Sequence, residues 1–167
     1  MSHEIEYGRA TKEELPAVVD LCMQVEEQHE QYWRLRWERR AGLPEGYLHW
    51  FGKRMNDPAM FIAVARDRAS ATEQGGAVVA GMVLASIVDE IPIYTFKQYA
   101  MVQDIAVRPE YRRRGIAQRL LAETAAWART QGVNQLRLMV ANQNPDARKL
   151  FAKAGFQPTY QEMVLPL

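Results

Sequence analysis

The sequence predicts an α/β domain built on a mixed β-sheet, and three observations support this class. A β-branched apolar run over residues 101–107 is followed by a turn, a helix-period pattern and a second alternating run over 135–140. Because a strand–helix–strand crossover in one sheet joins parallel strands, these two runs form a parallel pair. The apolar runs 60–65 and 77–88 flank a polar loop that ends in two glycines, as in an antiparallel hairpin. At 167 residues, 48% of them hydrophobic, residues 1–167 form a single domain with a full core.

The chain begins with a predicted edge strand and helix. Residues 4–9 alternate weakly between apolar and polar, as an edge strand does. Thr11-Lys-Glu-Glu14 is a capping box, in which Thr11 caps the amide of Glu14 and the Glu14 side chain reaches back. Pro16 stands late in the first turn, so it is expected to remove a backbone bond or bend the helix start. Apolar residues at helical spacing extend the predicted helix to about residue 28: Leu15, Val18, Cys22 and Val25.

Residues 26–50 combine many charges with aromatic side chains. Trp33 and Trp37 are one helical turn apart and share a face, which favours a core or dimer contact over a binding cage. Gly42-Leu-Pro44 interrupts this region, and a second short helix is predicted to about Met55. Residues 60–65 and 77–88 then form strands around a loop over 66–76, with Gly81 marking a bulge. Residues 89–98 form an irregular connection.

The last third of the chain carries clear helix signals. A helix starting after Gly115 places apolar side chains toward a core and is ended by Gly132: Ile116, Leu120, Leu121, Ala125, Trp127 and Ala128. A final helix has Asn144 as its cap, Pro145 at its first position and Gly155 as its end. We expect residues 156–167 to supply one or two closing strands.

The turn between the central strand and the next helix has the features of a phosphate site. It contains three consecutive arginines, then Gly115 and Ala117, with the unpaired first amides of a helix directly after them. A residue without a Cβ lets a ligand approach the backbone, and the helix dipole favours an anion. The alternative interpretation is a solvated surface turn that happens to be basic.

Two motifs in this region resemble those of the GNAT superfamily of N-acetyltransferases. Arg112-x-x-Gly115-x-Ala117 fits the pattern (Arg/Gln)-x-x-Gly-x-(Gly/Ala), and about thirty residues later comes a second motif. That motif is Asn144-x-x-Ala147-x-x-Leu150-Phe151-x-x-x-Gly155-Phe156. The resemblance covers residues 98–156. It implies a mixed, mostly antiparallel central sheet with a splayed parallel strand pair, flanked by helices on both faces.

The resemblance also implies a coenzyme site and a reaction. The family moves an acetyl group from acetyl-CoA to an amine, which here is expected to be a small molecule attacking directly in a ternary complex. The residues implied to bind acetyl-CoA lie at the end of the central strand, in the arginine turn and in the second motif: Ile105, Ala106, Val107, Arg112, Arg113, Arg114, Gly115, Ile116, Ala117, Asn144 and Phe151.

One departure from the family pattern affects catalysis. Relatives usually have a tyrosine that protonates the leaving thiolate, whereas this chain has Phe151, which has no proton to give. Three interpretations stay open. Tyr160 or Tyr111 serves as the acid, the thiolate leaves unassisted because a thiol of pKa near ~8.5 is a fair leaving group, or the domain binds the coenzyme without transferring.

The amine must lose a proton before it attacks, and Asp104 on the central strand is the candidate base. Glu90 or Glu162 acting through water are alternatives, and a strand carboxylate that bonds only to backbone is another. Cys22 falls among apolar helix positions and is expected to be a small buried side chain rather than a nucleophile.

The acceptor is less defined by sequence. Glu26, Glu27 and Glu30, with nearby aromatic residues, suit a cationic and partly apolar amine, although a solvated acidic helix face explains them equally. Two rival functions remain, a peptide or protein N-acetyltransferase and a non-catalytic acyl-CoA sensing domain.

Composition excludes several other classes. A formal net charge of +1 gives no global attraction to nucleic acid or membranes, and no Gly-x-x-x-x-Gly-Lys-(Ser/Thr) motif occurs. The three histidines lack ligand spacing, so no metal is expected. Without a signal pattern or an apolar run of ~20 residues, the protein is expected to be cytoplasmic, and its aromatic residues suggest a homodimer.

Overall fold

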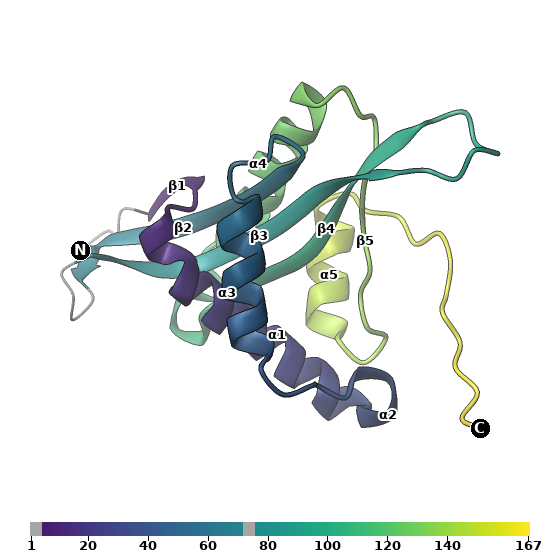
Figure 1. Ribbon diagram of the computed structural model, residues 1–167, viewed down its shortest axis with the longest axis horizontal. Coiled ribbons are helices and arrows are strands. Elements are labelled where there is room, and N and C mark those ends of the chain that lie inside the picture. The colour runs from purple at the N-terminus through teal and green to yellow at the C-terminus, as the bar shows by residue number, and fades with distance from the viewer. Residues whose placement is uncertain (1–4, 72–75) are drawn as a thin grey trace.

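The computed structural model describes residues 5–71 and 76–167, which contain a five-stranded sheet in the order β1-β2-β3-β4-β5 (Figure 1). Strands β1 to β4 pair antiparallel with their neighbours, and β4 pairs parallel with β5. The strand bounds are Ile5–Arg9, Met60–Ala71, Ala77–Asp89, Gln98–Val107 and Leu136–Leu138. The predicted fold class and the predicted parallel pair are therefore confirmed.

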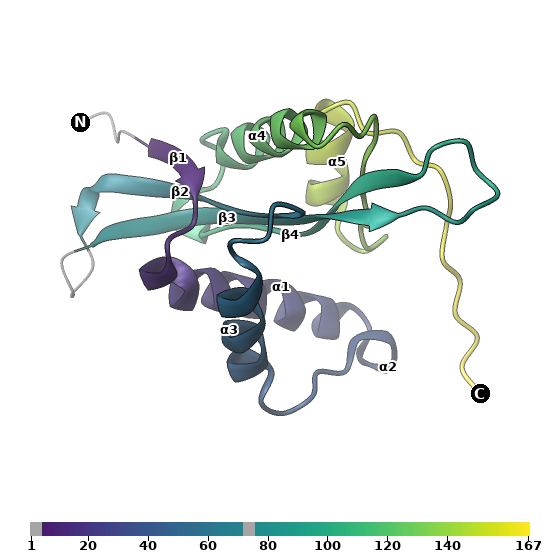
Figure 2. The ribbon, with the colours of Figure 1, turned by 45° about the horizontal axis from the view of Figure 1, so that its top comes forward.

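Helices cover both faces of this sheet, as Figure 2 shows. On one face lie α1 (Leu15–Tyr32), α2 (Arg34–Trp37) and α3 (Leu43–Arg54), and on the other lie α4 (Ile116–Thr130) and α5 (Pro145–Lys153). Short 3-10 helices span Lys12–Glu14 and Pro109–Tyr111. Because the 3-10 helix Lys12–Glu14 ends where α1 begins, Pro16 falls in the first turn of α1. An amide in the first turn has no partner within the helix, so the proline costs no backbone hydrogen bond there.

Strand alternation gives each face its own core. In β2, Phe61 and Ala63 pack toward α4 and α5, while Ile62 and Val64 pack toward α1 and α3. Cys22 is fully buried in the second of these cores, as the sequence predicted.

Register shifts between neighbouring strands shape the sheet, and two of them are single-residue β-bulges near its centre. Ala65 pairs with Gly81, but the next residue, Arg66, pairs with Val79. β3 therefore carries Ala80 as an extra residue, directly beside the glycine that was expected to mark a bulge. In β4 the partner of Leu84 is Asp104 and that of Ala85 is Val102, which leaves Gln103 as the extra residue. The parallel ladder reaches only Val102, so β4 has no strand beside it on the β5 side from Gln103 onward in the described chain. This is the expected splay.

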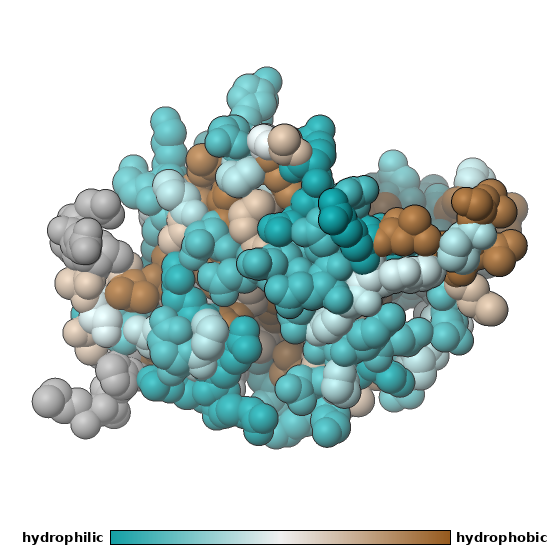
Figure 3. Space-filling model, turned by 90° about the horizontal axis from the view of Figure 1, so that it is seen from below, coloured by the Kyte–Doolittle hydropathy of each residue, from teal (hydrophilic) through white to brown (hydrophobic). Residues whose placement is uncertain are grey.

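The end of the chain differs from prediction. Residues 156–167 form no helix or strand and are mostly exposed, so the expectation of closing strands is wrong within this chain. A strand needs a neighbouring edge to satisfy its backbone, and the segment does not follow the free edge of β5. Figure 3 shows hydrophobic side chains at the end of the molecule where this segment and the β3–β4 hairpin lie.

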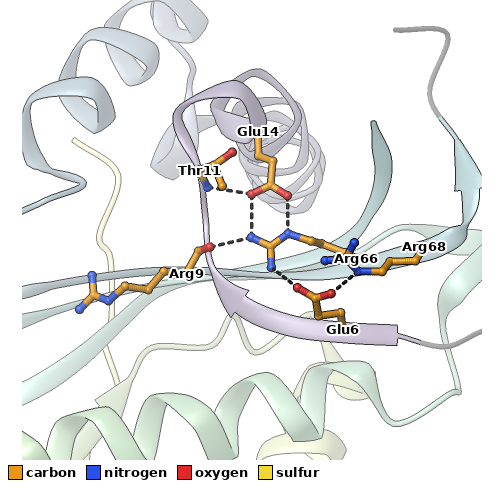
Figure 4. Close-up of polar contacts among 6 residues, drawn as sticks. All are labelled: Glu6, Arg9, Thr11, Glu14, Arg66 and Arg68. Carbon is orange, nitrogen blue, oxygen red and sulfur yellow. Dashed lines mark hydrogen bonds and ion pairs between the residues drawn. The ribbon is translucent and has the colours of Figure 1, made fainter. Parts of the chain in front are cut away.

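The loop predicted over residues 66–76 is also partly wrong, because β2 continues to Ala71. Arg66 stays in the strand and is nine-tenths buried, since its guanidinium is fully engaged (Figure 4). Its Nε and Nη2 donate to Glu14 at 2.5 and 2.8 Å, and Nη2 also donates to the carbonyl of Arg9 at 2.6 Å. The Thr11 amide donates to the same Glu14 carboxylate at 2.8 Å, as the capping box predicted.

Candidate functional site

The turn between β4 and α4 has backbone geometry suited to an anion. Gly115 has φ of +79° and Arg113 has φ of +64°, both in the left-handed region. No side chain caps the first amides of α4, and the first turn holds no acidic residue. A Cβ at Gly115 would meet nothing within 4 Å, so the backbone angle, and not lack of space, favours glycine there. Unpaired amides at the positive end of a helix dipole are suited to an anion such as a phosphate.

Two of the three arginines brace the loop. The Arg112 Nε donates to the carbonyl of Val107 at 3.1 Å, and Arg114 Nη2 donates to the carbonyl of Glu110 at 3.0 Å. Arg113 makes no hydrogen bond or ion pair with residues 5–71 or 76–167, so its charge is free for a ligand. The bracing arginines fix the loop, and the remaining one supplies electrostatic attraction.

A buried carboxylate that sequence reasoning missed supports this loop from below. Asp67 on β2 is fully buried and accepts a hydrogen bond from the Tyr111 hydroxyl at 2.8 Å. It also accepts from the Ser70 hydroxyl at 2.8 Å and the Ala69 amide at 3.0 Å. The Arg114 guanidinium lies 5.2 Å from the centre of the Tyr111 ring. The sequence gives little indication of this role for Asp67, because it shows only an acidic residue within the predicted loop 66–76.

Asp104 is a titratable residue of β4, one position beyond the Gln103 bulge, where β4 separates from β5. It is nine-tenths buried, and its carboxylate makes no hydrogen bond with the described residues. Burial, with a smaller contribution from the nearby charge of Glu26, raises its pKa to about 7. The Tyr47 hydroxyl donates to the Glu26 carboxylate at 3.1 Å. At neutral pH, Asp104 is therefore poised between its acid and base forms.

Three features lie along β4 and the turn that follows it. They are a strand end that separates from its parallel neighbour, helix amides suited to an anion, and a carboxylate of raised pKa. The sequence profile described as the acetyltransferase (GNAT) family matches residues 17–156 of the chain. The chain belongs to the GNAT acetyltransferase family. It is also 38% identical over 63 residues to the uncharacterized N-acetyltransferase YycN of Bacillus subtilis (strain 168). That match spans 38% of this chain and 40% of YycN, well under half of either protein.

Solved structures share the GNAT fold over nearly the whole chain. The BH1408 tetramutant from Bacillus halodurans superposes with a TM-score of 0.73 at 18% identity, covering 98% of this chain and 99% of its own. Aminoglycoside 6'-N-acetyltransferase AAC(6')-Ih from Acinetobacter baumannii gives 0.70 at 19%, covering 98% of each chain. A predicted acetyltransferase from Clostridium acetobutylicum, solved with acetyl-CoA, gives a TM-score of 0.73 at 16% identity, covering 98% of this chain and 96% of its own.

In this GNAT domain the second motif has a clear structural role. The Asn144 side chain accepts a hydrogen bond from the Ala147 amide at 3.1 Å and caps α5, as predicted. Phe151, on α5, is buried in the core on this face of the sheet, with its ring 5.9 Å from that of Phe156 in an edge-on contact. The residue in place of the family tyrosine thus packs as a core side chain.

The alternative bases are both ion-paired. The Glu90 carboxylate lies 2.5 Å from Arg137, and its pKa is lowered by hydrogen bonds from the Ile91 amide and from Arg137. The Glu162 carboxylate pairs with Arg36 on α2 at 3.1 Å. Tyr160, the candidate acid, is largely exposed, and its hydroxyl lies 3.4 Å from the sulfur of Met139.

A half-open groove of about 2010 Å³ runs beside the splay. Aromatic and apolar side chains line much of it, including Trp33, Trp37, Tyr94, Phe96 and Met139. His29 stacks on Trp37 with ring centres 5.4 Å apart, and burial lowers its pKa, so it is neutral at pH 7. A smaller pocket of about 320 Å³ includes Glu26, Trp37 and Tyr47. The tryptophan stripe thus faces open space, and neither tryptophan is fully buried.

Two further observations concern the parts of the chain described here. No helix within residues 5–71 or 76–167 is long and apolar enough to cross a membrane. Within the same residues, no three His, Cys, Asp or Glu side chains gather closely enough to hold a metal ion.

Proposed function

We propose that the protein transfers an acetyl group from acetyl-CoA to the primary amine of a small molecule by direct attack in a ternary complex. The observation that carries this proposal is Asp104. A buried carboxylate without a hydrogen-bond partner in the described chain, with a pKa of about 7, lies where the sheet opens. A general base works best when its pKa lies near the operating pH.

The coenzyme would be bound by the arginine loop and the open edge of β4. The amides at the start of α4, including those of Ile116 and Ala117, would hold the pyrophosphate, with Arg113 adding charge. Arg112, Arg114 and Gly115 would shape that loop. The main-chain groups of residues 105–107 (Ile105, Ala106 and Val107) would bind the pantetheine arm between the splayed strands and polarise the thioester carbonyl.

Asp104 would accept a proton from the ammonium group of the acceptor. The freed amine then forms a bond to the carbonyl carbon, the carbon–sulfur bond breaks as the thiolate leaves, and the second proton on the nitrogen passes to solvent to give the neutral amide. Burial and the charges of Asp104 and Glu26 raise the pKa of the Cys22 thiol, so Cys22 stays protonated. This supports direct transfer over an acyl-enzyme intermediate.

Tyr160 is proposed as the group that protonates the leaving thiolate, because Phe151 cannot. Its hydroxyl is on the groove side of β5, held at Met139, and faces solvent for recharging with a proton. Asn144 would contact the coenzyme arm through the atoms that its capping bond leaves free, and Phe151 through its ring.

The acceptor is proposed to be a cationic amine with an apolar portion. Glu26 supplies negative charge next to Asp104, and Trp37 and Tyr47 supply aromatic faces in the smaller pocket. Several GNAT structures of the same fold are aminoglycoside acetyltransferases, which makes amino sugars the first acceptors to test. The cytoplasm is the proposed location.

The test is thiol release from acetyl-CoA with aminoglycosides, polyamines, amino acids and N-terminal peptides, with coenzyme binding followed by calorimetry. Turnover on one small amine class supports the proposal, and turnover on peptides alone replaces it with a peptide acetyltransferase. Binding without turnover on any amine favours an acyl-CoA sensor, the alternative that Phe151 supports. Absence of coenzyme binding contradicts both.

A further inference from the structure

The short strand β5 is joined to the sheet by few backbone bonds. Its parallel ladder with β4 spans the three residues Leu136–Leu138, and the last pair in it joins Val102 to Leu138. Parallel pairing is slightly less stable per residue than antiparallel pairing. Among the residues that the structure describes, β5 pairs with no strand except β4. Side chains must therefore help to fix where β5 lies.

Arg137 links β5 to the hairpin formed by β3 and β4. Its Nη2 lies 2.5 Å from the carboxylate of Glu90, the residue directly after β3, and the Glu90 side chain is only 9% exposed. On the way, the guanidinium carbon of Arg137 lies 3.8 Å from the centre of the Tyr99 ring on β4. Figure 1 shows β5 next to the base of this hairpin. We call the pair formed by Glu90 and Arg137 the clamp.

Both ends of the clamp are held by further bonds. The Nε and Nη2 of Arg137 donate to the side-chain oxygen of Gln135 at 2.9 and 2.6 Å. The Glu90 amide donates to the carbonyl of Lys97 at 2.8 Å, and its carboxylate accepts from the Ile91 amide at 3.0 Å. A planar guanidinium held by two acceptors and an aromatic ring has little freedom to move. The clamp is therefore a rigid connection between β5 and the hairpin.

The clamp lies directly behind the point where the strands separate. In the ladder, Arg137 pairs with Met101, one position before the last pair of Val102 and Leu138. Leu138, on the other face of β5, packs against the core. The core thus holds one face of β5 and the clamp holds the other, so the last pair forms a closed end to the slot between β4 and β5.

The direction of the coenzyme in the proposed function points the acyl group toward this closed end. The pyrophosphate would lie at the turn after β4, and the pantetheine arm would run back along residues 107 to 105. The acyl carbon must then lie near Asp104, between that arm and the last pair of the ladder. Each carbon added to the acyl chain would bring it closer to Val102 and Leu138. A close-packed wall that cannot move rejects such an addition.

We propose that the clamp keeps this end of the slot shut and thereby limits the donor to a short acyl group such as acetyl. The inference rests on the proposed function, which places the thioester in the slot. Glu90 and Arg137 are positioning residues, because they act through β5 and touch no reacting atom. Without the clamp, β5 can move away from β4 at the last pair, and the slot admits longer chains.

The test is calorimetric binding of two non-transferable thioethers, S-ethyl-CoA and S-butyl-CoA, so it needs no acceptor. The ethyl group has the two carbons of an acetyl group, and the butyl group adds two methylenes. Because one methylene changes selectivity about 10-fold or more, the native protein should bind S-ethyl-CoA at least about 10-fold more tightly. In Glu90→Gln and in Arg137→Met this preference should fall to about threefold or less.

A double variant and a control separate the clamp from a general loss of stability. Glu90→Gln with Arg137→Met should show the same preference as either single variant, because both changes remove one contact. Arg34→Met removes an ion pair of 2.7 Å with Glu38, both exposed on or next to α2, and should keep the native preference. Circular dichroism follows folding. Glu90→Gln removes a charge with little change in volume, so it provides the result if Arg137→Met fails to fold.

The outcomes distinguish the clamp from the proposed function. An unchanged preference in the folded variants, additive effects in the double variant, or no preference in the native protein each overturns the clamp. If both thioethers bind in these cases, the coenzyme site and the proposed function still stand. Failure of the native protein to bind either thioether contradicts the coenzyme site itself, and the proposed function with it.

Discussion

The proposed coenzyme loop and the proposed acceptor side are built in different ways. The loop is a continuous stretch, residues 107–117, whose arginines bond to carbonyls four and five positions away. The proposed acceptor side collects residues from α1, α2, β4 and β5 around a groove of about 2010 Å³, and α3 contributes to the smaller pocket beside it. Local geometry fixes the proposed coenzyme loop, whereas the packing of distant segments forms the proposed acceptor side. Substitutions in the two regions should therefore affect coenzyme binding and proton transfer separately.

The largest expected effect on the reaction rate comes from Asp104, on the proposed acceptor side. Asp104→Asn should lower kcat about 10²- to 10⁴-fold, the usual contribution of a general base, with the dissociation constant of acetyl-CoA unchanged. In the native protein the rate should rise with pH through about 7, as Asp104 becomes a carboxylate. Asp89→Asn, at the exposed end of β3, is the matched control. A full rate in Asp104→Asn would remove Asp104 as the base.

The same residue should make the protein less stable as pH rises. The pKa of Asp104 is raised from 3.8 to about 7, so between these values the folded state holds a proton that the unfolded state has released. This stabilisation is complete below pH 4 and is lost as pH rises through 7. It amounts to roughly 4 kcal/mol. Urea unfolding at pH 5 and 8 should show the loss in the native protein, and Asp104→Asn should lack this component.

On the coenzyme side, Gly115→Val tests the left-handed turn. A side chain at φ of +79° costs about 1–2 kcal/mol or shifts the loop, so the affinity for acetyl-CoA should fall about 5- to 30-fold. Gly132→Val is the matched control, because Gly132 has φ of +75° and equally open surroundings after α4. Calorimetry should find it destabilised to a similar degree with unchanged coenzyme affinity. Equal affinities in the two variants would contradict the phosphate-loop assignment.

The smallest effect should come from the support beneath the loop. Tyr111→Phe removes one hydrogen bond to Asp67, worth about 1 kcal/mol, so the KM for acetyl-CoA should rise about fivefold. The kcat at saturating coenzyme should stay the same, because the hydroxyl positions the loop and does not touch the reacting atoms. Tyr7→Phe, whose half-buried ring lies in the same core, should change neither constant. A fall in kcat instead would point to Tyr111 as the acid.

Sequence reasoning was most successful where the signal is local. The Asn144 cap, the glycine turns and the crossover from β4 through α4 to β5 depend on neighbours along the chain, and all were confirmed. It was wrong for Arg66, which was assigned to a loop because it begins a polar run that ends in two glycines. Glu14 and the Arg9 carbonyl, supplied by other elements, make its burial favourable.

By itself, the sequence determined the family and the order of elements as far as residue 155, because helix caps, turns and alternation are encoded in adjacent residues. Only the tertiary structure decided the rest of the candidate site. Gln103 became a bulge because of the register of β3 against β4, and Asp104 acquired its raised pKa from burial beside Glu26. Asp67 was recruited beneath Tyr111 from a distant strand. Desolvation and pairing depend on which groups meet in space, and residue spacing does not contain that information.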